Sequence, residues 1–304
     1  MVLILFRYIY SKTIYIILTI YLILIYTYSS YAFNGASKGL YVWYSSLVPV
    51  ILPVMILLRL IYLSSSKNNL WAIIFLSALA GIPTSSKIIS DMYVSKRIDE
   101  KKYKYLLLLT ANPSLSFLST YIVLLINKRH SINGFLLVFP VIVVFISSTI
   151  TAIFFLSFNK NYNLPTYTCT QKKHAISDIT INDFDDIILS STQIMLKILG
   201  YIVFFSSFCE ILLLFSDSYI LTIARSFIEI SCGVLIIVDN FSEPALYYPL
   251  INSLCAFGGV CGIFQILSIL PKESNISLGF LVKYKMLNAI IAFSISYIIM
   301  LIIN

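Results

Sequence analysis

Long, uninterrupted runs of apolar residues recur along the whole chain, for example at 132–158 and 280–303. A helix needs about 20 such residues to cross the hydrocarbon core of a bilayer. The runs do not alternate between polar and apolar residues, which favours helices over the strands of a membrane barrel. We therefore predict an all-α integral membrane protein whose main partner is the lipid bilayer.

The composition excludes a water-soluble protein. Only 11% of the 304 residues are charged, and the mean hydropathy is +0.93, whereas soluble domains contain about 25% charged residues. The net charge is +8. Because the basic residues lie mainly in short loops between the apolar runs, as the positive-inside rule requires, we do not interpret this charge as a nucleic-acid surface.

No sequence pattern indicates an enzyme or a cofactor. The 5 cysteines show no C-x-x-C spacing, and the 2 histidines lie in polar loops, so we predict no metal site. Nothing resembles a G-x-S-x-G, H-E-x-x-H or nucleotide-binding motif. We therefore predict that the chain is not an enzyme and binds no cofactor.

The runs divide the chain into four parts. We expect an N-terminal transmembrane helix at 1–38, a first half at 39–158, a polar inner loop at 159–191 and a second half at 192–304. The predicted fold has about six transmembrane helices plus two re-entrant helical hairpins in an inverted-repeat arrangement, as in many secondary transporters.

The first predicted hairpin is the stretch 70–94. Gly81 and Pro83 interrupt it at mid-length, and a straight span would place Lys87 and Asp91 in lipid. Two half-helices that meet at a polar tip inside the protein avoid this cost. We therefore expect Gly81 and Pro83 to shape the tip.

The second predicted hairpin is the stretch 219–238, which Arg225, Glu229 and Gly233 interrupt. Intramembrane carboxylates often serve in gating or proton coupling, and we predict that role for Glu229, with Arg225 and Asp91 assisting. The alternative is a structural ion pair between Arg225 and Glu229, four residues apart. Gly233 would shape the tip of this hairpin.

Several short motifs follow one another from residue 39 towards the C-terminus. They are Gly39-Leu40-Tyr41-Val42-Trp43 with the prolines Pro49 and Pro53, Gly81-Ile82-Pro83-Thr84-Ser85-Ser86-Lys87-Ile88, Ile98-Asp99-Glu100 with Leu106, Leu107 and Thr110, Phe227-Ile228-Glu229-Ile230-Ser231-Cys232-Gly233, and Phe257-Gly258-Gly259-Val260 with Gln265. In this order they resemble the sporulation integral membrane protein YlbJ family, whose members carry the nucleoside-recognition, or Gate, type of membrane domain. The resemblance implies transport of dipicolinic acid across the outer forespore membrane of a sporulating bacterium.

Lys87 is the first candidate for binding such a substrate. Dipicolinate is a flat dianion, and a cation at a hairpin tip, with half-helix N-terminal amides beside it, would bind its carboxylates. Thr84, Ser85 and Ser86 can donate hydrogen bonds at the same tip. The alternative is that Lys87 only neutralises Asp91, four residues further on.

The other substrate-binding candidates lie in later segments. Asn112 and Ser114 flank a proline that breaks the span 104–126, which either lines a cavity or only kinks a helix. Gly258 and Gly259 allow close backbone approach, to a substrate or to a neighbouring helix. Two further members of this group are polar residues in apolar surroundings, Ser231 and Gln265.

Three functions remain open from the sequence. The first is a carrier for a small organic anion, with dipicolinate preferred. The second is an ion-coupled carrier for a nucleoside or another small solute, which would need no cation at position 87. The third is a membrane component that assembles a sporulation complex without transporting anything. A homo-oligomer is compatible with all three.

The topology is testable with single cysteine labels. With the N-terminus inside and both hairpins re-entering, most Lys and Arg residues fall on the inner side. We therefore expect a membrane-impermeant thiol reagent to reach a cysteine in the loop 239–243 from the outer side and one in the loop 96–104 only from the inner side. The opposite result for one loop alone would contradict the double-hairpin topology.

Overall fold

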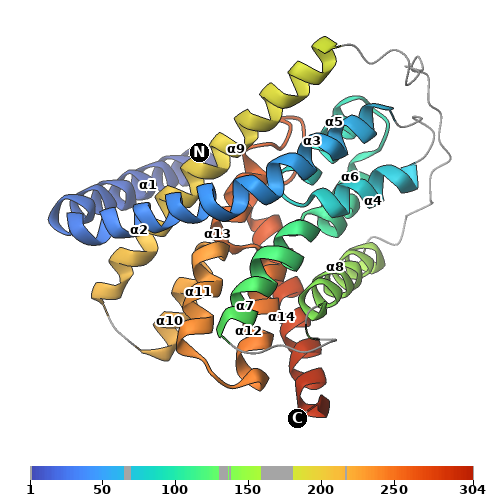
Figure 1. Ribbon diagram of the computed structural model, residues 1–304. Coiled ribbons are helices and arrows are strands. Elements are labelled where there is room, and N and C mark those ends of the chain that lie inside the picture. Colours follow the sequence, from blue (N-terminus) through green and yellow to red (C-terminus); the bar gives the residue numbers. More distant parts are fainter. Residues whose placement is uncertain are drawn as a thin grey trace.

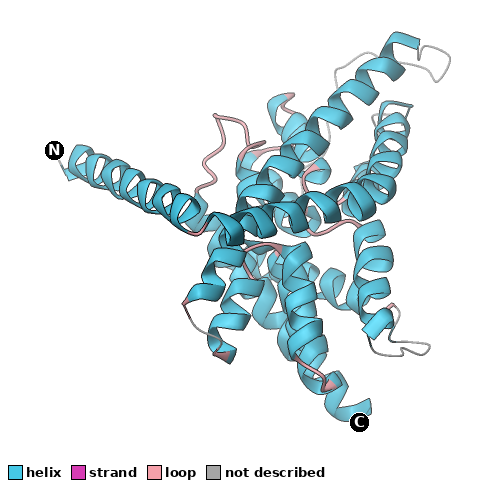
Figure 2. Cartoon of the chain, turned by 60° about the vertical axis from the view of Figure 1, so that its left-hand side comes forward, coloured by secondary structure: helices cyan, strands magenta, loops and turns pink. Residues whose placement is uncertain are grey.

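The computed structural model describes residues 2–64, 70–129, 136, 138–158, 181–215 and 218–303. Every regular element in these ranges is a helix (Figures 1 and 2). Most of the polar loop predicted at 159–191 lies outside the described residues, and its last part, from residue 181, already belongs to a long helix.

Five helices within the described ranges are long and apolar enough to cross a membrane. They are Ser29–Ile61, Phe139–Ser157, Ile181–Leu214, Pro244–Leu267 and Leu278–Ile303. This agrees with the prediction of an all-α membrane protein.

The same order of elements occurs twice after the N-terminal helix α1 (Val2–Thr27): a long helix, a helical hairpin, a broken helix and a straight helix (Figure 1). In the first half these are α2 (Ser29–Val42) continuing through the π-helical turn η1 (Trp43–Leu47) into α3 (Val48–Ser64), then α4 (Leu70–Ala80) and α5 (Thr84–Val94), then α6 (Glu100–Thr110) with η2 (Phe117–Ile122) and α7 (Val123–Arg129), and α8 (Phe139–Phe158). In the second half they are α9 (Ile181–Ile211) with η5 (Leu212–Leu214), then α10 (Tyr219–Ser226) and α11 (Ile230–Asn240), then α12 (Pro244–Phe257) and α13 (Gly259–Leu267), and α14 (Leu278–Ile303).

Both hairpins are made of helices too short to cross a bilayer. Helices α4, α5 and α11 have 11 residues each and α10 has 8, and 11 residues of α-helix extend about 16 Å, roughly half of the hydrocarbon thickness. The turns fall within the predicted hairpins, at residues 81–83 and 227–229. At the first turn Gly81 has φ 65°, a left-handed conformation that favours glycine.

Two predicted straight spans are broken in the structure. The span 104–126 is interrupted between Thr110 and Ser114, as the Asn-Pro-Ser sequence indicated. The apolar segment after Glu243 is divided by Gly258 at φ 84° into α12 and α13. A left-handed residue turns the chain out of the helix axis, so this glycine ends one helix and starts the next.

The N-terminal region also differs from the expected single helix at 1–38. Helix α1 ends at Thr27, and residues 29–38 belong to the long helix that runs on to Ser64. Helix α1 extends away from the remaining helices (Figure 2). The long helix of the first half therefore begins about three helical turns before residue 39, where the first half was expected to start.

The hairpin of each half packs against a broken helix of the other half. The first hairpin shares a buried apolar cluster with α13 of the second half, through Ile88 and Ile89 against Ile263 and Ile266. Helix α11 of the second hairpin packs against η2 and α7 of the first half, where the Tyr121 hydroxyl donates to the Ser231 carbonyl oxygen at 3.1 Å. Each hairpin is therefore held by the broken helix of the other half.

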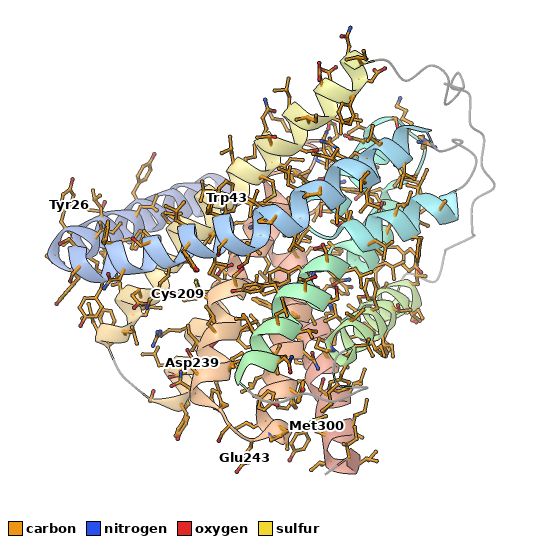
Figure 3. All side chains as sticks on the ribbon, in the orientation of Figure 1. Tyr26, Trp43, Cys209, Asp239, Glu243 and Met300 are labelled. Atoms are coloured by element: carbon orange, nitrogen blue, oxygen red, sulfur yellow. The ribbon has the colours of Figure 1, made fainter. Side chains whose placement is uncertain are left out.

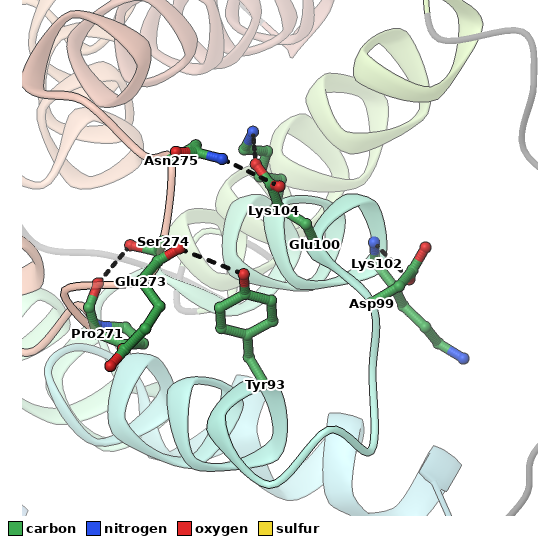
Figure 4. Close-up of polar contacts among 9 residues, drawn as sticks. All are labelled: Tyr93, Asp99, Glu100, Lys102, Lys104, Pro271, Glu273, Ser274 and Asn275. Atoms are coloured by element: carbon green, nitrogen blue, oxygen red, sulfur yellow. Dashed lines mark hydrogen bonds and ion pairs between the residues drawn. The ribbon is translucent and has the colours of Figure 1, made fainter.

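Loops that the positive-inside rule places on one side lie together. The chain after α13 contacts the start of α6: the Asn275 amide donates to Glu100 at 3.3 Å, and Lys104 forms an ion pair with Glu100 at 2.5 Å (Figure 4). Towards the opposite end of the molecule lie Asp239, Glu243 and Met300 (Figure 3). These two groups of loops therefore lie apart, and which side of a membrane each one faces stays a prediction.

The two long helices cross at a pair of glycines. Gly35 and Gly39 of α2, four residues apart, face α9, where a Cβ on Gly35 would lie 2.4 Å from the Ser206 carbonyl oxygen. Small residues at this spacing let membrane helices approach closely. Beyond the crossing, the Trp43 indole donates to the Met195 carbonyl oxygen at 3.0 Å.

Gly35→Ala is expected to lower the thermal unfolding midpoint in detergent. The added methyl group meets backbone and must push the helices apart, at a cost of about 1–3 kcal/mol, which exceeds the gain of about 1 kcal/mol from replacing Gly in a helix. Gly200→Ala on α9 is the matched control, because nothing lies within 4 Å of its added Cβ. The control should keep or raise the midpoint; equal behaviour of the two variants would contradict the close crossing.

Candidate functional site

Both hairpin tips and both helix breaks meet at one cavity of about 50 Å³. The two halves contribute corresponding parts: a hairpin tip, the start of a half-helix after a break, and one face of a long helix. The lining residues are Leu47, Ile51, Ile82, Pro113, Ser114, Phe117, Ile198, Ile202, Glu229, Ile230, Ser231, Gly258, Cys261, Gly262 and Gln265.

The first tip is bonded to the first break. The Ile82 amide donates to the Asn112 carbonyl oxygen at 2.8 Å. A Cβ on Gly81 would lie 2.2 Å from the Ser114 nitrogen, so only glycine permits this approach. The Ile82 side chain also reaches the second break, because its Cδ1 would lie 3.0 Å from a Cβ on Gly262.

The second tip is bonded to the second break in the same way. The Val260 amide donates to the Phe227 carbonyl oxygen, and the Cys261 amide to the Ile228 carbonyl oxygen, both at 2.9 Å. Gly259, at φ 71°, lies against this tip, with a Cβ position 3.2 Å from the Ile228 oxygen. The tips therefore satisfy main-chain groups that the helix breaks leave free.

Several helices begin at the cavity. Helices α5, α11 and α13 and the helical segment 115–129 all start within two residues of a lining residue. The first amides of a helix have no partner within it and carry a partial positive charge. Ser114 accepts from the Phe117 amide at 3.1 Å, and Glu229 from the Cys232 amide at 2.8 Å. The cavity is therefore a favourable place for negative charge.

Glu229 supplies the carboxyl group of the cavity. It is 1% exposed, and none of the lining residues is basic. Arg225 does not form an ion pair with it; the Arg225 guanidinium donates instead to the Cys209 carbonyl oxygen at 3.2 Å, away from the cavity lining. Within the described ranges no three His, Cys, Asp or Glu side chains are grouped to hold a metal ion.

Lys87 does not line this cavity. It lies on α5 beyond the tip and forms an ion pair with Asp91 at 2.6 Å, with both side chains almost half exposed. This is the geometry of the alternative interpretation, in which Lys87 neutralises Asp91. The three hydroxyl residues before Lys87 are buried in the first turn of α5, also outside the lining: Thr84, Ser85 and Ser86.

Some of the remaining predicted residues line the cavity, and others lie behind its lining. Ser114, Ser231, Gly258 and Gln265 line the cavity, and the Gln265 amide also donates to the Cys261 sulfur at 3.3 Å. Three others lie behind the lining or shape the backbone: Asn112, Gly259 and Pro83. Gly233 lies in α11 and not at the turn. A Cβ on Gly233 would lie 2.0 Å from the Ser226 carbonyl oxygen.

A buried lysine that the sequence analysis did not select joins the two breaks. Lys285 of α14 is 3% exposed. Its ammonium donates to the Ala111 carbonyl oxygen and, at 3.4 Å each, to the Asn112 side-chain oxygen and the Ala256 carbonyl oxygen. Asn288, one turn further on, donates to the Ala256 oxygen at 3.0 Å.

A signal for this lysine is present in the sequence. Lys285, Asn288, Ala292 and Ser296 follow one another at intervals of three and four residues, and all are buried. Polar and small residues at this spacing form one face of a helix. Lys283, two residues before Lys285, lies on the exposed side, so the two lysines do not share a role.

Comparisons of the chain with family models, with curated proteins and with solved structures gave no match. The resemblance to the YlbJ family therefore depends on the motifs quoted above. Several of these motifs fall at the two tips and the two breaks, including Gly81, Glu229 and Gly258.

The capping role of Glu229 is testable by comparing two neutral replacements. Glu229→Gln keeps an oxygen that can accept from the Cys232 amide, whereas Glu229→Ala does not, so the Gln variant should be more stable by about 1 kcal/mol. Glu243 is the control, since it precedes α12 without a side-chain capping bond. Its Gln and Ala variants should have equal unfolding midpoints; an equal pair at Glu229 would contradict the cap.

Proposed function

We propose that this chain is a membrane transporter for a small organic anion. The observation that carries the proposal is the cavity at which two hairpin tips meet two helix breaks. At membrane depth, irregular backbone is tolerated where it is buried in protein or lines a cavity, and transporters place substrates at such discontinuous helices. The full topology proposed has about six transmembrane helices and two re-entrant hairpins in inverted halves, with the N-terminus inside a bacterial cell.

Dipicolinate is the first substrate to test. The motif resemblance suggests it, together with the outer forespore membrane as the location. The helix starts around the cavity support an anion, because each carries a partial positive charge. Lys87, which points away from the cavity and pairs with Asp91, is proposed to attract the substrate during its approach.

In this proposal Glu229 is the group that carries a proton. A second negative charge in a buried cavity beside this carboxylate would be strongly repelled. Glu229 must therefore be protonated when an anion is bound, and its hydroxyl would donate a hydrogen bond to the substrate. Transport of the anion then takes a proton with it.

A second function is favoured by the lack of basic side chains in the lining. A neutral solute such as a nucleoside would donate hydrogen bonds to Glu229 and the Ser231 and Gln265 side chains, and it would not need a cation. In that case Glu229 would remain charged and bind a coupling ion.

The cavity has to open in either case. A volume of about 50 Å³ holds only roughly three or four water molecules. Because each tip is attached to the adjacent break by one or two main-chain hydrogen bonds, separation of a tip from its break is the proposed opening movement.

Terbium-loaded liposomes containing the protein test the anion proposal directly. Dipicolinate added outside should raise terbium luminescence above that of empty liposomes, faster at lower pH and by up to about tenfold per pH unit if one proton is required. Glu229→Gln should still transport but lose this pH dependence, because its amide is neutral at every pH. Glu243→Gln should behave like the wild type.

The negative outcomes separate the other functions. Folded protein that gives no luminescence rise but takes up a nucleoside under a cation gradient would contradict the anion proposal. That result would support transport of a neutral solute instead. No uptake of either, with Glu229→Gln complementing a deletion strain fully, would support the assembly role instead.

A further inference from the structure

We infer that the Lys285 ammonium occupies a monovalent-cation site and replaces a cation that the protein would otherwise take from solution. The site is formed by oxygens at the ends of α6 and α12, where both halves break. It lies behind the cavity lining, on the side opposite to the helix starts.

The ligands of the ammonium are neutral oxygens from both halves. Ala111 and Asn112 follow the last turn of α6, and Ala256 lies in the last turn of α12. The last carbonyl groups of a helix have no partner within it and carry a partial negative charge. An ammonium donates three hydrogen bonds, and three oxygens surround this one.

No carboxylate balances this charge. Lys285 forms no ion pair with an acidic side chain in the part of the chain that is described. Two helix ends, each equivalent to about half a negative charge, instead compensate one positive charge. The site therefore has the donor set of an alkali-metal cation: two main-chain carbonyls and one amide oxygen.

A surrounding layer orients these oxygens. Asn288 donates to the Asn112 side-chain oxygen at 3.4 Å as well as to Ala256, and its own oxygen accepts from Thr151 of α8 at 3.4 Å. Asn112 in turn holds the first hairpin tip through Ile82. The cation thus connects α6, α8, α12 and α14 to the tip, so loss of the cation is expected to destabilise all of these elements.

The experiment measures stability and not transport, so its result is independent of the proposed function. Thermal unfolding midpoints in detergent are compared in choline, Na⁺, K⁺ and methylammonium chlorides at equal ionic strength. The wild-type midpoint should be the same in all four. Lys285→Ala should unfold about 5–10 °C lower in choline and recover at least half of this loss in one or more of the small cations.

Two controls separate charge from packing. Lys285→Met fills the space without a charge, so its midpoint should be low in every salt. Lys283→Ala removes an exposed lysine two residues away and should match the wild type throughout. A lowered Lys285→Ala midpoint that no cation changes, or an unchanged midpoint, would overturn the inference.

A folding failure of Lys285→Ala in choline is also informative. Purification in parallel with Na⁺ or methylammonium should then recover monodisperse protein. Failure in every salt, together with a Lys285→Gln midpoint that is equal in all four salts, would overturn the inference. If the inference and the proposed function both hold, dipicolinate uptake will not require a Na⁺ gradient.

Discussion

Main-chain groups freed where helices break are the constraint on which this structure depends. Two hairpin turns and two helix breaks leave amides and carbonyls without helical partners, and such groups are costly to bury unless they find other partners. The protein pairs them with one another: Ile82 with Asn112, and Val260 and Cys261 with the second turn. The remaining carbonyls at the ends of α6 and α12 accept from Lys285.

This pairing separates the charges of the site. Helix starts lie at the cavity, while the carbonyl groups of Ala111 and Ala256 at two helix ends accept from the buried lysine behind it. Glu229 and Lys285 therefore each occupy the electrostatic environment that suits their charge. A solute that enters the cavity meets both a carboxyl group without a basic partner and the positive ends of several helices, which is why proton coupling and anion binding belong to one proposal.

The sequence predicted the irregular elements better than the site residues. Gly81 with Pro83, and Asn112-Pro113-Ser114, are local chain breakers, and the structure is broken at both. Lys87 was selected because it follows the tip. It lies one turn into α5, however, and the helix places its side chain on the same face as Asp91, with which it forms an ion pair. Lys285 was overlooked because its neighbour Lys283 and the preceding loop made it look like one of the inner-side lysines that surround a span.

Composition and hydropathy by themselves determined the class, since a chain with 11% charged residues cannot cover a water-facing surface, and local breakers determined where helices stop. Only the tertiary structure decided which breaks meet, which tip each one holds and which lysine is buried. The bonds between tips and breaks join residues about 30 positions apart, such as Ile82 with Asn112, and the buried lysine contacts Ala111 of the other half. No local pattern encodes such pairings. The cavity is formed where two pairs of tip and break, each joined by main-chain hydrogen bonds within its own half, meet.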